Sequence, residues 1–587
     1  MREIVTIQVG GFANFIGSHF WNFQDELIGL ADEPHGDAIF KDSGLDMDVF
    51  YRSGETQQGF LTYTPRLLSV DLPGSLGSLQ SSGSLYEGSV TKIVSEPHKK
   101  NLFLQSLEEE EKDISTNFGS NSVPKNGNGV IQQERDKDRV ECLQKCVQFW
   151  TDFAKVHYHP RSLYELTGLW SDKQEFNNFG SGRDVFSRSL HGEEMSESLR
   201  FFVEECDHIQ GFFFFSIHLL VSYSAMLTLE ILPVMQGFQF IVDDSGGFSN
   251  VATDFLENIS DEYTSTPVLL YAARGPGNYT NILGQHARTL RALHDSVSFS
   301  RLSSFCKLMV PIGLPSLSKV SAHLCVDDEM PFHSSAVYAA GLHSISLPFR
   351  MSTLGPATHS ESTFGALDVA TFTQLLADQA RQNMVSVLDI AMPAPPLPGE
   401  QNQRFVQRSL HPLTPDVKEE ADDDAHGIES TVIHGALRQG GTRASITEVK
   451  EAFCLDYQNC KSLPLFSNIS IALCPLPLPL PFPRLFQNTL GQHGEITMNP
   501  TASGALGSLD VFSIPMAARL RSSNAILPFI EKRLLDFRRY GMARGSLGSQ
   551  LLQSWGFQRD ELEDMAESQA NMVQLLGGGS EGSSDSD

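Results

Sequence analysis

The feature that most constrains the fold is the stretch at residues 237–250, where an apolar run meets two glycines. It predicts a buried strand, a glycine-bearing turn and a helix that begins near Ser249 or Asn250. Free N–H groups at a helix N-terminus form an anion site, so a nucleotide-binding α/β protein would hold its phosphate chain here. However, two acids, Asp243 and Asp244, stand where such a loop needs glycine or serine. The candidate phosphate contacts are Ser245, Gly246, Gly247 and Ser249.

A second strand, glycine turn and helix open the chain. Residues 4–9 are mostly apolar and include β-branched side chains, and Gly10 and Gly11 follow them. Beyond the glycines, apolar residues recur at helical spacing. This order is typical of a doubly wound α/β fold, in which ligands bind beyond the carboxyl ends of the strands. Gly10 and Gly11 are therefore further candidates for phosphate contact. The alternative is a tight connection that needs glycine only for a positive φ.

Composition narrows the class of protein. The 587 residues are enough for two or more domains, each with its own core, and 41% of them are hydrophobic. A net charge of −28 argues against a nucleic-acid-binding protein, which would carry a basic face. The eight cysteines form no CxxC pair, a pattern typical of a reduced intracellular protein without zinc or disulfides. The N-terminus leads directly into a strand and is expected to be neither a signal nor a transit peptide.

Several segments carry a resemblance to tubulin. Residues 1–10 are similar to the tubulin N-terminus, and residues 11–26 are closer still to the Misato family of tubulin-like proteins. Residues 156–162 resemble Misato proteins and not tubulins, whereas residues 557–572 resemble the acidic helical C-terminal region of tubulin. The resemblance implies an α/β fold of the tubulin/FtsZ type. Such a fold has a doubly wound, mostly parallel nucleotide-binding-type domain, followed by a second α/β domain and C-terminal helices.

A third candidate loop comes from the same resemblance. Residues 63–75 resemble the tubulin strand and loop that approach the γ-phosphate and its metal. Asp71 and Gly74 then match nucleotide-binding positions, and Asp71 is a candidate Mg²⁺ ligand. The second acid of that loop, expected after the leucine, is missing. Residues 364–372 weakly resemble the tubulin segment that activates water in a neighbouring subunit's site, but Ala370 stands near the expected acid. The resemblance implies GTP or GDP with Mg²⁺ as the cofactor, but the loops that would bind it lack residues that tubulin has.

Three segments interrupt the resemblance. Residues 77–137 combine Gly/Ser clusters with an acidic run and predict a disordered acidic insertion. Residues 211–236 are about as apolar as a membrane span, yet Gln-Gly-Phe occurs both at 210–212 and at 236–238. Deleting 211–236 restores the expected helix–turn–strand order. An in-frame insertion, such as a translated retained intron, is therefore favoured over a membrane helix. Residues 393–430 predict a linker or loop.

The expected organisation follows from these interruptions. The first domain is expected at 1–76 and 138–325, the second at 326–392 and 431–515, the C-terminal helices at 516–576, and a flexible acidic tail at 577–587. Apolar residues at helical spacing between residues 140 and 156 predict a helix after the first insertion. A Leu/Pro run at 475–483 is an SH3- or WW-type ligand or, as we favour, a segment that lies against its own domain.

Two functions remain open at this point. The first is a non-catalytic tubulin-like protein. For it the Misato resemblance implies a role in mitochondrial distribution, morphology and mitochondrial DNA inheritance, with a cytoskeletal link. The second is a GTP-binding, self-assembling GTPase. We favour the first because the acids in the 237–250 loop would repel a phosphate chain. Expected partners are cytoskeletal or mitochondrial-surface proteins, tubulin or a second copy of the chain. The expected location is the cytoplasm and the outer mitochondrial surface, with membrane association peripheral at most.

Overall fold

The computed structural model describes residues 3–55, 59, 61–77, 79, 144–167, 176–187, 190–208, 237–279, 284–351, 362–377, 385–398, 407–418, 427–458, 464–497, 504–543 and 545–577. The predicted insertion at 211–236 lies outside these residues. Nearly all of the predicted disordered segment at 77–137, parts of the predicted linker at 393–430 and the tail after residue 577 also lie outside them.

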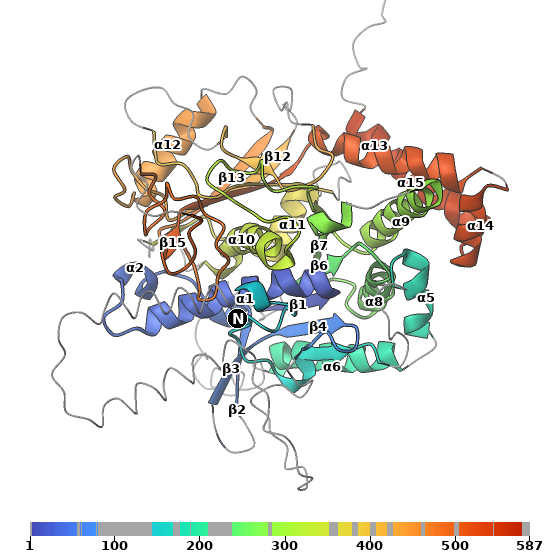
Figure 1. The fold of residues 1–587 in the computed structure, drawn as a ribbon, viewed down its shortest axis with the longest axis horizontal. Coiled ribbons are helices and arrows are strands. Elements are labelled where there is room, and N and C mark those ends of the chain that lie inside the picture. Colours follow the sequence, from blue (N-terminus) through green and yellow to red (C-terminus); the bar gives the residue numbers. More distant parts are fainter. Residues whose placement is uncertain are drawn as a thin grey trace, which may run out of the picture.

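A six-stranded parallel sheet forms the first half of the fold (Figure 1). Its strands lie in the order β5-β4-β1-β6-β7-β8, and each neighbouring pair is parallel. The strands are β1 (Ile4–Val9), β4 (Leu67–Asp71), β5 (Leu163–Glu165), β6 (Gly237–Asp243), β7 (Val268–Ala273) and β8 (Leu308–Ile312). The strand order reverses between β1 and β6, so their carboxyl ends mark the crevice where doubly wound proteins hold ligands. The predicted doubly wound sheet is confirmed.

Helices cover both faces of this sheet. α1 and α10 pack on one face, and α6 and α8 pack on the other, with α5 and α9 beside α8. The helices are α1 (Gly11–Asp32), α5 (Phe179–Ser187), α6 (His191–His208), α8 (Phe248–Glu262), α9 (Gln285–Ser304) and α10 (Pro331–Arg350). A separate hairpin of β2 (Tyr51–Glu55) and β3 (Leu61–Pro65) projects beyond the sheet (Figure 1). Coverage on both faces explains why the strands are mostly apolar and do not alternate between apolar and polar residues.

The second sheet is mixed and lies against the other side of α10. Its order is β11-β10-β16-β12-β13-β9, in which β12 and β13 are parallel and β16 is antiparallel to both neighbours. The strands are β9 (Thr363–Phe364), β10 (Val387–Ala391), β11 (His411–Pro412), β12 (Ile428–His434), β13 (Phe466–Ala472) and β16 (Met516–Ser522). α10 is therefore buried on nearly every side, which its apolar and small residues allow.

Shorter elements complete the second half. α11 (Val369–Ala377) packs against β12 and β16, and α12 (Ile446–Gln458) packs against β13. β14 (Leu476–Pro477) pairs with β15 (Ser513–Ile514). The Leu/Pro run that contains β14 is buried except at half-buried Leu480, so the expectation that it lies against its own domain is confirmed. Within the predicted linker, β11 joins the sheet by pairing with β10.

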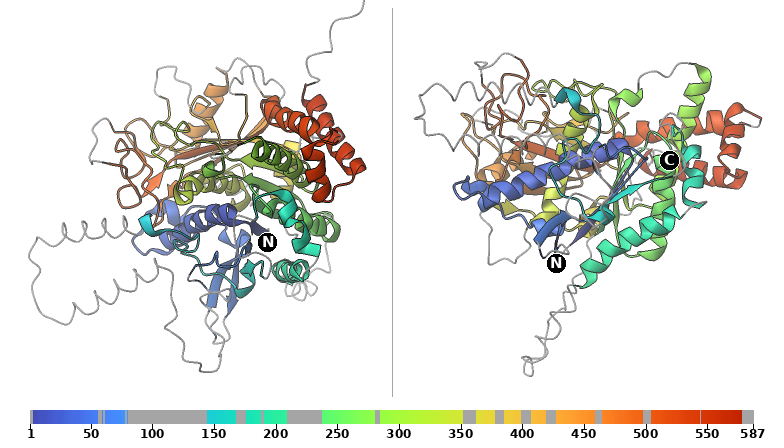
Figure 2. Two further views of the ribbon diagram at one scale, coloured as in Figure 1. Left: turned by 45° about the vertical axis from the view of Figure 1, so that its right-hand side comes forward. Right: turned by 60° about the horizontal axis from the view of Figure 1, so that its bottom comes forward.

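The C-terminal helices lie beside α9, as both views of Figure 2 show in red and green. They are α13 (Leu527–Asp536), which continues into a π-helical turn at Phe537–Gly541, then α14 (Leu547–Ser554) and α15 (Arg559–Gly577). The predicted C-terminal helices are confirmed, but they begin at Leu527 and not at residue 516, because residues 516–522 form β16 between β10 and β12. Within the ranges given above, no helix combines the length and the apolar character that crossing a membrane requires.

Candidate functional site

The carboxyl ends of β1 and β6 meet at the point where the strand order reverses. Gly10 follows β1 with a φ of +102°, and α1 begins at the next residue. A Cβ atom on Gly10 would lie 2.6 Å from the Asp243 Cβ and 2.8 Å from the Phe248 ring. Gly10 is therefore required both for its backbone conformation and for this close packing. The structure therefore brings the predicted glycine turn at Gly10 and Gly11 next to the predicted 237–250 loop.

The carboxylate of Asp243 lies at the N-terminus of α1. Its Oδ2 accepts the backbone N–H of Phe12 at 3.1 Å. Its Oδ1 accepts the backbone N–H of Ser245 at 3.1 Å and the Ser245 hydroxyl at 2.5 Å. Burial raises the pKa of Asp243, and the hydrogen bonds from Ser245 and Phe12 act in the opposite direction. The chain thus supplies its own anion where a helix N-terminus would otherwise receive one from a ligand.

The glycine turn is packed against the segment that leads into α5. The Gly247 N–H donates to the Phe176 carbonyl oxygen at 3.3 Å. A Cβ atom on Gly246 would lie 2.3 Å from that carbonyl oxygen, and one on Gly182 would lie 2.0 Å from the Gly247 carbonyl oxygen. Ser249 is fully buried in the first turn of α8. The candidate residues Ser245, Gly246, Gly247 and Ser249 are together at the loop, as predicted, but protein groups contact them directly.

Asp244 faces away from this point and belongs to an ion-pair network. The Arg274 Nε lies 2.9 Å from Asp244 Oδ1, and the Arg274 Nη2 lies 2.9 Å from Asp295 Oδ1. Burial favours the neutral form of Asp295, but Arg274 and Arg291 outweigh it and lower its pKa. His294 Nε2 lies 2.6 Å from the Asp244 carbonyl oxygen. Sequence reasoning missed Arg274, although it directly follows β7 and so had to lie at this edge of the sheet.

The carboxylate of Asp71 is held by three N–H donors. Leu72 N–H donates to Oδ1 at 2.8 Å, and Asn14 Nδ2 and Trp150 Nε1 donate to Oδ2 at 3.0 and 3.2 Å. Mg²⁺ needs oxygen lone pairs that face the ion, so this donor set does not fit a magnesium ligand. No group of three or more His, Cys, Asp or Glu side chains in the described part of the chain is arranged to hold a metal. Gly74, the remaining candidate, has a φ of +81° and donates its N–H to Glu165 Oε1 at 2.8 Å.

Residues 149–155, which we call the strap, cross α1 beside Asp71. Three polar residues one turn apart on α1, namely Asn14, Ser18 and Asn22, face the strap and its surroundings. The Ser18 hydroxyl donates to the Trp150 carbonyl oxygen at 2.9 Å. Asn22 donates to the Phe153 carbonyl oxygen and accepts the Lys155 N–H, both at 2.8 Å. The helix predicted for residues 140–156 is therefore wrong from residue 147 onward, because the apolar side chains pack around α1 instead.

The 156–162 segment continues the strap and is structural. The Tyr158 ring packs edge-on against Trp150, with ring centroids 6.0 Å apart. His159 caps a 3-10 turn (η2, Pro160–Ser162) by accepting the Arg161 N–H, and its ring stacks on Phe201 of α6 at 4.7 Å. In the weakly matched 364–372 segment, Asp368 accepts the Thr371 N–H at 2.7 Å at the start of α11.

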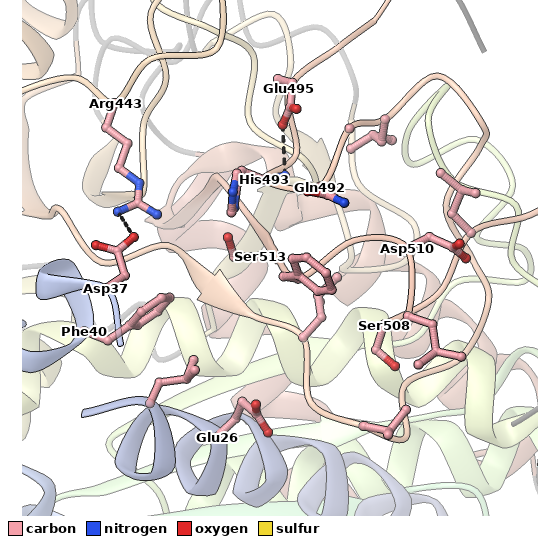
Figure 3. Close-up of a pocket in the computed structure, with 18 of the residues that line it drawn as sticks. Glu26, Asp37, Phe40, Arg443, Gln492, His493, Glu495, Ser508, Asp510 and Ser513 are labelled. Atoms are coloured by element: carbon pink, nitrogen blue, oxygen red, sulfur yellow. Dashed lines mark hydrogen bonds and ion pairs between the residues drawn. The ribbon is translucent and has the colours of Figure 1, made fainter. Parts of the chain in front are cut away.

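A pocket of about 980 Å³ lies away from these loops (Figure 3). It is lined by Glu26 and Leu30 of α1, by the short helix α2 (Ala38–Lys41), and by loops between residues 478 and 513. Fifteen residues of helix separate Gly11 from Glu26, roughly 22 Å along α1. No pattern in the sequence indicates this pocket, because its walls come from four segments that lie far apart in the chain.

Comparisons with known proteins agree with this architecture. Residues 2–147 match the family model of the Misato Segment II tubulin-like domain, and residues 140–218 match a tubulin domain model. The chain is 27% identical to misato homolog 1 of Bos taurus over 98% of both chains. It is 30% identical to misato homolog 1 of Homo sapiens over 60% of both chains. It is also 28% identical to misato of Drosophila melanogaster over 53% of this chain and 52% of that protein.

Proposed function

Because the chain belongs to the Misato family of tubulin-like proteins, we propose that it acts as a non-catalytic tubulin-like protein. Its role is in mitochondrial distribution, morphology and inheritance of mitochondrial DNA, with a cytoskeletal link. The observation that carries the non-catalytic part is the Asp243 carboxylate at the N-terminus of α1. The mitochondrial part rests on the family resemblance alone.

Electrostatics support the non-catalytic reading. A phosphate oxygen about 4 Å from the Asp243 carboxylate would be repelled by about 4 kcal/mol at an effective dielectric constant of 20. Several N–H groups at these loops already donate to protein acceptors, among them Phe12 N–H to Asp243 and Gly247 N–H to Phe176. Each of these hydrogen bonds must break before a phosphate can bind. Nucleotide affinity is therefore expected to be weaker than that of an open loop by several hundredfold or more.

The second candidate is a GTP-binding, self-assembling tubulin-like GTPase. One observation favours it. Gly10, Asp71 and the 245–249 loop all lie at the carboxyl edge of the parallel sheet, where such a nucleotide would be held. The surroundings of Asp71 and the packing of Phe176 weigh against it. We therefore keep it as the alternative that the first experiment must exclude.

The experiment measures nucleotide on the purified full-length protein. Acid-released nucleotide is quantified by ion-exchange chromatography, and GTP turnover is measured with and without Mg²⁺. We expect much less than one nucleotide per chain and no Mg²⁺-dependent turnover. One GTP or GDP per chain together with protein-dependent hydrolysis would establish the GTPase instead.

A double variant tests whether Asp243 is the cause of the weak nucleotide affinity. Asp243→Gly with Asp244→Gly removes both carboxylates and is expected to raise guanine-nucleotide affinity at least tenfold, measured with a fluorescent GDP analogue. Asp244→Gly alone serves as a comparison, because Asp244 pairs with Arg274 and not with the N-terminus of α1. Exposed Asp261 on α8 provides a charge-matched control, Asp261→Asn. An unchanged affinity in the double variant would show that the loop is not a phosphate site.

Partners and location belong to the same proposal. We expect protein partners at the cytoskeleton or the mitochondrial surface, with tubulin or a second copy of the chain as candidates, and peripheral association at most. Alkaline carbonate washing of mitochondria tests the last point, because it releases peripheral proteins. Retention of the protein in the washed membranes would contradict it and would favour a membrane segment at residues 212–235.

A further inference from the structure

The pocket of Figure 3 has an acidic lining. Four carboxylates line it, from Glu26, Asp37, Glu495 and Asp510, against one guanidinium, from Arg443. Arg443 Nη1 lies 2.7 Å from Asp37 Oδ2, so this cation is already paired within the wall. Glu26 pairs with Lys155 of the strap. The net charge that the lining presents to a ligand is therefore negative.

Apolar side chains lie between these carboxylates. They come from three segments and include Leu30, Phe40, Leu478, Leu480, Leu490 and Phe512. A volume of about 980 Å³ lies within the usual range for sites that enclose a small molecule or a few side chains. An acidic and apolar lining favours a ligand that carries a cation on a hydrocarbon stem. Lysine and arginine side chains have this character.

Two polar groups in the wall are placed for such a ligand. Glu495 Oε2 accepts the His493 N–H at 2.9 Å, which fixes the carboxylate in its loop, and Glu495 is in no ion pair among the described residues. Ser508 is only 7% exposed, and its hydroxyl has no hydrogen-bond partner within the described chain. Other buried hydroxyls of the described chain are unpaired too, but this one lines a pocket, where it is available to a ligand.

We propose that this pocket binds an ammonium or guanidinium group on an apolar stem, with Glu495 and Asp510 as the charged contacts. The stem would lie along the leucines and Phe512, and the Ser508 hydroxyl would accept a hydrogen bond from the cation. The source is either a free alkylamine or a basic side chain of a protein partner. This inference does not depend on nucleotide binding, because the pocket and the α1 N-terminus are separate.

Titration calorimetry on the full-length protein tests the proposal and distinguishes the two sources. Octylamine is compared with octan-1-ol, which has the same stem without the charge. A five-residue blocked peptide of alternating leucine and lysine is compared with its leucine and glutamate counterpart. We expect saturable binding of octylamine, of the lysine peptide or of both, and none of the uncharged or acidic partners. Binding of the peptide alone identifies a protein side chain as the source.

Substitutions test whether the cationic ligand binds in the pocket. Glu495→Gln and, separately, Asp510→Asn should each weaken the cationic ligand about tenfold, and Asp560→Asn on the exposed first turn of α15 should not. Two variants are used because Glu495 also holds its own loop, and circular dichroism confirms that each one is folded. Absence of binding to the wild-type chain would overturn the proposal, and so would equal binding to all three variants.

Discussion

At the scale of single residues, Asp243 explains most of what is unusual in the candidate site. A carboxylate at a helix N-terminus is stabilised by the helix dipole by about 0.3–2 kcal/mol, and hydrogen bonds to a charged group add about 1.5–3 kcal/mol each. Burial of the same carboxylate opposes this gain and raises its pKa. The hydrogen bonds from Phe12 and Ser245 offset part of that cost. Asp243 is thus a structural anion and not merely an obstacle to a ligand.

Another aspartate gives a prediction about pH. Asp254 of α8 is largely buried, and burial raises its pKa to about 7, with Arg301 acting against the shift. The folded chain therefore holds this proton more tightly than the unfolded chain does. Stability from this group is present below about pH 4 and falls as the pH rises toward 7.

Asp254→Asn is expected to remove that pH dependence. Above pH 7 the variant should be more stable than the wild type by up to about 4 kcal/mol, since each pKa unit corresponds to about 1.4 kcal/mol. At pH 4 the two proteins should be equal. The midpoint of urea unfolding, followed by tryptophan fluorescence at pH 4, 6 and 8, checks this. A constant difference at all three pH values would mean that Asp254 does not titrate in this range.

The residue types at the site were predictable, but most of their contacts were not. The glycine turn after β6 and the conflicting acids can be read from neighbouring positions, because strand, turn and helix signals are local. The contacts of Trp150 with Asp71 and of Phe176 with Gly247 join positions about 70 or more residues apart. No periodicity in a single sequence encodes such pairs. For this reason the sequence could not show that Asp71, the candidate Mg²⁺ ligand, is held by N–H donors.

At the scale of elements, α1 is the helix around which the site is assembled. Its N-terminus faces Asp243, its polar stripe holds the strap, and its C-terminal half lines the pocket. Polar residues inside an otherwise apolar helix face would be costly unless they were paired. Asn14 and Asn22 satisfy this condition, because each bonds to groups on other segments. A sequence reading that scores only apolar spacing overlooks this stripe.

Removing one member of the stripe should loosen the strap. Asn22→Ala leaves the Phe153 carbonyl and the Lys155 N–H without their partner, which should destabilise the protein by about 2–4 kcal/mol. Hydrogen exchange should show faster exchange in the peptide that contains residues 149–155. Asp32→Ala, at the exposed end of the same helix, is the control. Equal protection of the strap in both variants would contradict the role assigned to Asn22.

Two separate glycine-to-alanine variants test the close contact between α5 and the glycine turn. In Gly182→Ala the new Cβ would lie 2.0 Å from the Gly247 carbonyl oxygen, so the variant should lose about 1–3 kcal/mol through overpacking. Gly29→Ala on α1 makes the same chemical change where no atom lies within 4 Å. It should gain about 0.5–1 kcal/mol from helix propensity. Thermal unfolding of the two variants should therefore shift in opposite directions; a shift in the same direction would refute the contact.

At the scale of the whole molecule, one helix joins the two sheets. α10 packs against α1 and the first sheet on one side and against β10, β12 and β16 on the other, within one continuous core. Its last residue, Arg350, is fully buried, and burial lowers its pKa to about 10. The doubly wound half was predictable from glycine turns and strand order. The mixed second sheet was not, because its strand pairs, such as β10 with β16 and β12 with β16, join positions far apart in the sequence.

The apolar segment at residues 211–236 can be tested against this architecture. α6 ends at His208 and β6 begins at Gly237, so a variant that lacks 211–236 keeps every described element. If the segment is an insertion, the shortened protein should remain monodisperse in gel filtration. It should also unfold at the same urea concentration as the full chain. Aggregation or a lower midpoint would show that the segment belongs to the fold.

The Asp243 cap on α1 also bears on how such a protein could be regulated. In a nucleotide-dependent switch, the anion at the helix N-terminus is a bound nucleotide, and hydrolysis sets how long the switch stays in one state. Here the group at the helix N-terminus is the Asp243 side chain, which is part of the chain, so it can neither dissociate nor be hydrolysed. Under the proposed function, the protein would hold one conformational state regardless of the cellular GTP level. Control would then have to come from the amount of protein present and from the partners that reach it.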